Sequence, residues 1–147
     1  MDELIKLLDP NLMYISHNID GDTINIHVES IREDSICPYC DEPSIKVHSR
    51  YERKFQDLPI QDKKVRIILN NRKYFCYNEN CKHKTFAESF AFFKPKATKT
   101  IRLQDKILEV SISQSSISAS KYLRRNVANV SKSTICNLLK KRRADNG

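Results

Sequence analysis

Four of the five cysteines fall into two close pairs, a spacing that is typical of a zinc site. Cys37 and Cys40 are separated by two residues, and Cys76 and Cys81 by four. A CxxC turn places two thiolates on one side of a tight knuckle, and a second pair completes a tetrahedron around the metal. Because four thiolates leave no open coordination position, the spacing predicts one structural Zn²⁺ that does not activate water.

Other uses of these cysteines stay open from the sequence alone. Disulfides are disfavoured because the chain begins Met1-Asp2-Glu3 and lacks the basic start and long apolar region of a secretory signal, so we expect a cytoplasmic protein. A redox CxxC would need a surrounding βαβ pattern, which is missing. Four buried free thiols would not explain the pairing. His83 or His48 could replace one cysteine, and Cys136 is expected to be a partly buried helix residue.

The segments that must position the cysteines read mainly as β structure. After a short helix over 4–8, residues 13–18 and 23–28 predict a hairpin, in which Gly21 supplies the positive φ of a tight turn. A strand is predicted over 64–70, where apolar residues alternate, and 50–58 is a weaker strand candidate. So small a β unit has few large apolar residues, and a bound metal would add folding free energy directly.

The pattern becomes helical after the Lys94–Lys99 segment. Helices are predicted over 98–113, 116–125 and 132–143, with Ser115 or Ser116 and Ser131 as N-cap residues. The expected fold class is therefore α+β: a small β-rich, zinc-ribbon-like domain followed by a three-helix, helix-turn-helix domain. The expected domains are an N-terminal arm over 1–36, the zinc-ribbon-like unit over 37–93 and the helix-turn-helix domain over 94–147.

Residues 116–143 have the layout of a helix-turn-helix, with a turn over 126–130 and a second helix that opens on short polar residues. The first turn of such a recognition helix points at base edges, and the dipole at its N-terminus favours phosphate. A plain three-helix bundle is the alternative. The residues expected to contact DNA are Lys121, Arg124, Arg125, Ser131, Lys132, Ser133, Thr134, Asn137, Lys140 and Lys141.

Charge is divided unevenly along the chain, which has a net charge of +8. Residues 1–36 hold eight acidic and two basic residues, whereas the remainder has a net charge of +14. This asymmetry suggests that only the second part meets a polyanion, although a solvated basic surface would look the same. The segment 90–96 carries both phenylalanines and lysines. It could lie along DNA, or its rings could be buried against the zinc unit or join the two halves of the protein.

Several motifs together resemble the N-terminal half of the ISL-three class of insertion-sequence transposases. This resemblance covers roughly residues 30–143 and implies a zinc finger, a helix-turn-helix and binding to the terminal inverted repeats of a mobile element. It also implies that the four paired cysteines are the zinc ligands, and it gives Asp57 a recurrent position without an assigned role. The motifs are Cys37-Pro-Tyr-Cys40, Asp57-Leu58-Pro59, Val65–Leu69, Arg72-Lys-Tyr-Phe-Cys76 and Cys81–Glu88.

The sequence departs from that class at two points. Asp41 follows the first knuckle where glycine is usual, so the turn is expected to be slightly strained. The large catalytic domain of the class is expected to be missing, since the helical half of residues 1–147 holds only Asp105, Glu109 and Asp145 as carboxylates. The expectation is therefore a truncated transposase, or a fragment of one, that binds DNA without cutting or joining it.

The expected partner is double-stranded DNA, with a homodimer or a full-length transposase as further partners and no membrane, since no apolar run approaches ~20 residues. Two other functions stay open: a stand-alone, zinc-containing transcription regulator and a zinc-ribbon adaptor that binds another protein. A steep loss of binding with added salt would separate both DNA-binding functions from the adaptor.

Overall fold

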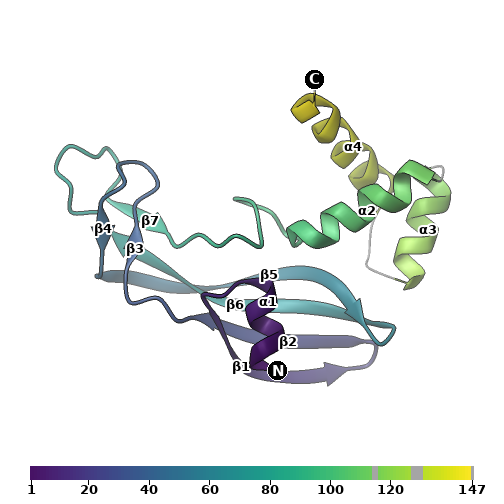
Figure 1. The fold of residues 1–147 in the computed structure, drawn as a ribbon, viewed down its shortest axis with the longest axis horizontal. Coiled ribbons are helices and arrows are strands. Elements are labelled where there is room, and N and C mark those ends of the chain that lie inside the picture. The colour runs from purple at the N-terminus through teal and green to yellow at the C-terminus, as the bar shows by residue number, and fades with distance from the viewer. Residues whose placement is uncertain (114–115, 127–130, 147) are drawn as a thin grey trace.

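The structure is a computed structural model that describes residues 1–113, 116–126 and 131–146 (Figure 1). A β-rich part comes first and a group of three helices follows, so the expected mixture of helices and a sheet-rich portion is confirmed. None of the helices within these ranges combines the length and the apolar character that crossing a bilayer requires. The elements are α1 (Asp2–Leu8), β1 (Leu12–Asp20), β2 (Thr23–Ser30), β3 (Ser35–Ile36), β4 (Pro43–Ser44), β5 (Val47–Ile60), β6 (Lys63–Phe75), β7 (Thr85–Ala87), α2 (Ile101–Ser113), α3 (Ser116–Asn126) and α4 (Lys132–Asn146).

The main sheet joins the N-terminal hairpin to the central strands. Its order is β1-β2-β6-β5, and β7 pairs with the end of β6. Strand β2 runs parallel to β6, with Thr23 opposite Lys64 and Glu29 opposite Asn70, whereas the other pairs are antiparallel. The main sheet thus combines β1 and β2, which precede the expected boundary at residue 36 between the arm and the zinc unit, with β5 and β6, which follow it. The division into three domains stays a prediction.

The β1–β2 and β5–β6 hairpins both have tight turns, but only the first turn has a sequence typical of one. Gly21 has φ +61 at the first loop position between β1 and β2, as predicted. The β5–β6 hairpin turns instead at Gln61 and Asp62, with φ of 49 and 66. Two consecutive residues with positive φ are typical of a type I′ turn, for which Asn-Gly is the preferred sequence. Gln61-Asp62 gives no such signal, and β5 extends to Ile60, two residues beyond the predicted end of strand 50–58.

Replacing Gln61-Asp62 with Asn-Gly should therefore stabilise the protein by about 0.5–1 kcal/mol, because glycine and asparagine relieve the left-handed strain. The measurement is the free energy of unfolding in urea. Gly21→Ala is the opposite change in the other hairpin and should destabilise by about 1 kcal/mol. An added Cβ at Gly21 meets no atom within 4 Å, so the cost there comes from the backbone alone. A loss of stability in the Asn-Gly variant would contradict the assignment of the turn.

One side of the sheet is covered by α1 and by the segment that follows β7. Ile26 on β2 and Phe55 on β5 are buried in this core, together with Ile5 of α1. Phe90, Phe92 and Phe93 complete this core and are 4–7% exposed. The rings of residues 90–96 are thus buried as one of the alternatives predicted, but in the core of the main sheet and not in the cluster around the cysteines. If this segment contacts DNA, the contact must be made by its lysines, Lys94 and Lys96, and not by the buried rings.

The three C-terminal helices pack around a separate cluster. Leu103 and Ile107 of α2, Leu123 of α3 and Ile135 of α4 are each fully buried. The expected helices are present, with α2 beginning three residues later and α4 ending three residues later than predicted. Ile112, which also has helical spacing on α2, is 67% exposed and stays outside this core.

A buried carboxylate joins the sheet to α2. Asp57 of β5 is 2% exposed and accepts hydrogen bonds from Thr100 Oγ1 at 2.8 Å and from Arg102 Nε at 2.8 Å. A second guanidinium nitrogen of Arg102 also donates to this carboxylate. Thr100 caps α2 by accepting the N–H of Leu103, and residues 98–100 run beside β5 through backbone hydrogen bonds with Gln56. The start of the helical group is thus fixed to the sheet.

Candidate metal centre and nucleic-acid interface

The four paired cysteines converge on one point. Cys37 is fully buried and the other three are partly buried, and their Sγ atoms all lie within 4.8 Å of one another. The Cys37–Cys81 Sγ distance is 4.0 Å and the Cys40–Cys76 distance is 3.5 Å. Zn–S bonds of ~2.3 Å in a tetrahedron place sulfurs ~3.8 Å apart. The donor set therefore fits one structural Zn²⁺, and the distances are far too long for disulfide bonds.

Short strands hold the two knuckles in place. The first knuckle lies between β3 and β4, whose residues pair as Ser35 with Ser44 and Ile36 with Pro43. The second follows β6, and the N–H of Cys76 donates to the carbonyl of Lys84 just before β7. Both pairs of cysteines thus lie at strand ends, as in a zinc ribbon. Tyr74 and Phe86 pack with the cysteines in a small cluster of their own.

Backbone donors around the sulfurs support metal binding. The N–H groups of Glu42, Asn78 and His83 donate to the Sγ atoms of Cys40, Cys76 and Cys81. Each donor lies two residues after its cysteine. Hydrogen bonds of this kind stabilise thiolates, because they place a positive dipole against the negative sulfur.

Two of the four thiolates, those of Cys76 and Cys81, are disfavoured when no cation is bound. The Glu42 N–H and the Asn78 side chain lower the pKa of Cys40 to about 7. Although the Asn78 N–H favours the Cys76 thiolate, burial and the neighbouring sulfurs raise the pKa of Cys76 to about 12. The His83 N–H favours the Cys81 thiolate, but burial and Cys40 together raise the pKa of Cys81 above its usual value. A divalent ion supplies the missing positive charge, which is why such sites bind metal with release of protons.

Three residues near the knuckles were singled out from the sequence: Asp41 for backbone strain, and His83 and His48 as alternative zinc ligands. Asp41 has φ 62, the left-handed conformation for which glycine is favoured, so the expected strain is present. His83 stacks on Tyr39 with ring centroids 3.5 Å apart, and His48 meets Phe75 edge-on. Within the described parts of the chain, neither histidine belongs to the converging ligand group.

These features define a four-thiolate zinc finger built on strand ends. Residues 33–81 match a family model described as the zinc-finger of transposase IS204/IS1001/IS1096/IS1165. The match spans about a third of the chain and includes all four cysteines. Comparison with curated proteins and with solved structures gave no match.

Most residues expected to contact DNA gather on α3 and α4. Those with exposed side chains are Lys121, Arg124, Lys132, Ser133, Asn137 and Lys140. The side chains of Arg125 and Lys141, and the turn residues 127–130, lie outside the described parts of the structure. Cys136 of α4 is partly buried, as expected.

Two of the expected contact residues already have partners within the helix. Ser131 Oγ accepts the N–H of Thr134 at 3.1 Å, which confirms Ser131 as the N-cap of α4. The two hydroxyl groups also lie 3.0 Å apart, within hydrogen-bond distance of each other. The hydroxyl groups of Ser131 and Thr134 are therefore engaged at the start of α4. The exposed Lys132, Ser133 and Asn137 are the better candidates for base contacts.

A buried ionic network beyond the cysteines was not predicted. Glu88 follows β7, is 1% exposed and accepts hydrogen bonds from Arg72 Nε at 3.2 Å and Ser30 Oγ at 2.6 Å. Arg32 also lies within 3.4 Å of it. The network ties the end of β2 to β6 and to the chain after the second knuckle. Sequence spacing gives no signal for it, because its members are up to 58 residues apart.

Proposed function

We propose that this protein is the DNA-binding N-terminal region of a transposase of the ISL-three class. The match of residues 33–81 to the transposase zinc finger carries the proposal, and the converging cysteines support it. In this function the zinc ion holds the β-rich part together, and α3 and α4 act as a helix-turn-helix that binds the inverted repeats at the ends of a mobile element. In this function, residues 1–147 bind DNA and do not cleave it.

The arrangement of α4 supports the assignment of a recognition helix. Its N-cap is formed by Ser131, and the first turn presents Lys132 and Ser133 to solvent. Asn137, one turn further, is exposed and of a type that binds adenine through two hydrogen bonds. Ile135, on the opposite side, is fully buried against α2 and α3. The helix therefore has one face for the core and a polar face for the major groove.

Changing both Lys132 and Asn137 to alanine should relax the sequence preference of the full chain. The preference is measured by selection from a pool of random duplexes, followed by titration of the best duplex and a scrambled one. Loss of one base contact costs about 1–3 kcal/mol, so affinity for the selected duplex should fall roughly 10- to 100-fold and that for the scrambled duplex much less.

Lys140→Ala is the matched control, because it removes one exposed charge further along the same helix. It should weaken binding to both duplexes equally and lower the salt dependence by about one counterion. If both variants weaken the two duplexes equally, α4 does not read bases. A preference for promoter DNA over inverted-repeat ends would favour a transcription regulator, and binding to neither would favour a protein adaptor.

A further inference from the structure

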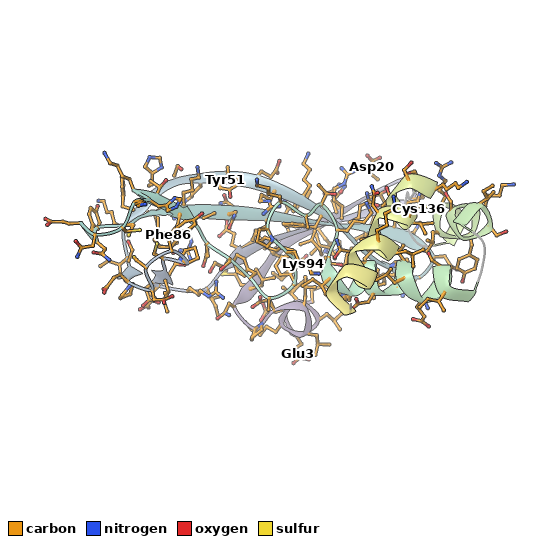
Figure 2. All side chains as sticks on the ribbon, turned by 90° about the horizontal axis from the view of Figure 1, so that it is seen from above. Glu3, Asp20, Tyr51, Phe86, Lys94 and Cys136 are labelled. Atoms are coloured by element: carbon orange, nitrogen blue, oxygen red, sulfur yellow. The ribbon has the colours of Figure 1, made fainter. Side chains whose placement is uncertain are left out.

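A basic groove lies between the segment that connects the two parts of the molecule and the C-terminal helices. It has a volume of about 870 Å³. One wall is the segment 94–99, called the strap below, with Lys94, Lys96 and Lys99. The other wall is formed by α2 and α4, including Leu108 and Thr134. Figure 2 shows Lys94 beside these helices, near the middle of the long axis of the molecule.

Contacts with β5 fix the backbone of the strap. Phe93, just before it, is buried and stacks on Phe55 with ring centroids 4.4 Å apart. The Arg53 guanidinium lies over both rings and donates to the carbonyl of Ala97 at 2.8 Å. The N–H of Gln56 donates to Thr98 at 2.9 Å. With the backbone fixed in this way, the lysines are presented from a rigid support.

Lys96 occupies a position that ordinarily favours glycine. The N–H of Ala97 donates to the carbonyl of Lys94 at 3.0 Å, which closes a turn with Pro95 and Lys96 at its centre. Lys96 has φ 64, as the third residue of a type II turn requires. A lysine there costs conformational energy that a glycine would not, and such strain is commonly retained where the side chain has a use.

The positive charges of the groove lie on the strap and the negative charges lie on α2. In the part of the chain that the structure describes, no carboxylate lies within ion-pair distance of Lys94, Lys96 or Lys99. Lys99 is partly buried, and this burial lowers the pKa of its ammonium group. Asp105 and Glu109 lie on the opposite wall, and Glu109 is 3.9 Å from Lys106. A polyanion in the groove would therefore follow the lysine wall and avoid α2.

We propose that the strap binds the sugar–phosphate backbone of the DNA whose bases α4 contacts, so that Lys94, Lys96 and Lys99 form a second phosphate site. The groove includes Thr134 in the first turn of α4, which places the two contact regions next to each other. This inference rests on the proposed function, and it adds that the connection between zinc finger and helices is itself part of the DNA interface.

The test compares two triple variants of the full chain by titration with a fluorescein-labelled random-sequence duplex. One changes Lys94, Lys96 and Lys99 to glutamine; the control changes the exposed Lys46, Lys54 and Lys73 on or beside β5 and β6. Both lower the net charge equally. Only the strap variant should reduce the slope of log K against log salt, by about 2–3, and weaken binding roughly 10- to 100-fold at physiological salt.

Lys96→Gly separates charge from folding. Glycine relieves the left-handed strain, so the thermal midpoint should be unchanged or higher, while the salt slope falls by about 1. Asp105→Asn should raise affinity several-fold, because it removes a negative charge from the facing wall.

Equal salt slopes for the two triple variants would overturn the strap site and leave the proposed function standing. If the strap variant instead changed the sedimentation behaviour of the protein without changing DNA binding, the groove would hold a protein segment and the inference would be wrong. A wild-type chain that binds no duplex at all would overturn the proposed function and the strap site together.

Discussion

Replacing Cys40 or Cys76 with serine is expected to abolish binding of one zinc ion per chain and to unfold the end of the sheet that carries the knuckles. The four sulfurs converge from strand ends that contain few other buried apolar groups, namely Tyr74 and Phe86. Zinc-finger sites commonly contribute about 10–16 kcal/mol of binding free energy, far more than this cluster can replace. Zinc content by atomic spectroscopy and hydrogen exchange of the purified protein provide the measurements.

The separate clusters of the fold make this effect local. The core around Phe55 and the helical core around Ile107 do not include the cysteines, so helices α2–α4 should keep their protection from exchange. Cys136→Ser makes the same chemical change outside the site and should retain the full zinc content. Wild-type exchange behaviour after complete removal of zinc by a chelator would show that the metal has no structural role.

Loss of the Asp57 carboxylate is the second large expected effect. Asp57→Ala removes the acceptor for Thr100 and Arg102 and leaves a cap and a guanidinium without their buried partner. Breaking a buried ion pair costs about 3–5 kcal/mol. Because the Arg102 side chain is 45% exposed and can turn toward water, we expect about 2–4 kcal/mol here, measured by urea unfolding.

Two other variants show whether the buried charge is responsible. Asp57→Asn keeps an acceptor of the same shape and should cost less than the alanine variant, because Thr100 retains its partner. Glu52→Ala breaks the exposed pair with Lys54 on the same strand and should change stability by at most about 1 kcal/mol. Equal losses for Asp57→Ala and Glu52→Ala would mean that the carboxylate does not join the sheet to α2.

The sequence predicts the parts of the fold that depend on local patterns. Paired cysteines indicate the metal centre because coordination chemistry restricts their spacing. Gly21 and Ser131 indicate a turn and a helix cap because each satisfies a need of the neighbouring backbone. The helical periodicity likewise places three helices to within a few residues.

The parts that the sequence does not predict depend on contacts between distant segments. The parallel pairing of β2 with β6 has no local signature, and neither has the network around Glu88. The role of Asp57 becomes visible only when Thr100 and Arg102 lie beside it. Gln61-Asp62 is unexpected for a different reason: tertiary pairing of β5 with β6 imposes a turn that these residues do not favour.

The β1–β2 hairpin is the first part of the sheet to be synthesised, and its strand β1 forms one edge of the finished sheet (Figure 1). Strand β2 can pair with β6 only after β6 has been synthesised, because Thr23 lies opposite Lys64. Ile26 shares its core with Phe92, so this core is complete only after Phe92 has left the ribosome. The two halves of the zinc site lie on either side of the β5–β6 hairpin, so the ion can close its shell only after Cys81 leaves the ribosome. We therefore expect metal capture and enclosure of the hairpin to occur together, late in folding, and to be slow because their contacts are distant in sequence.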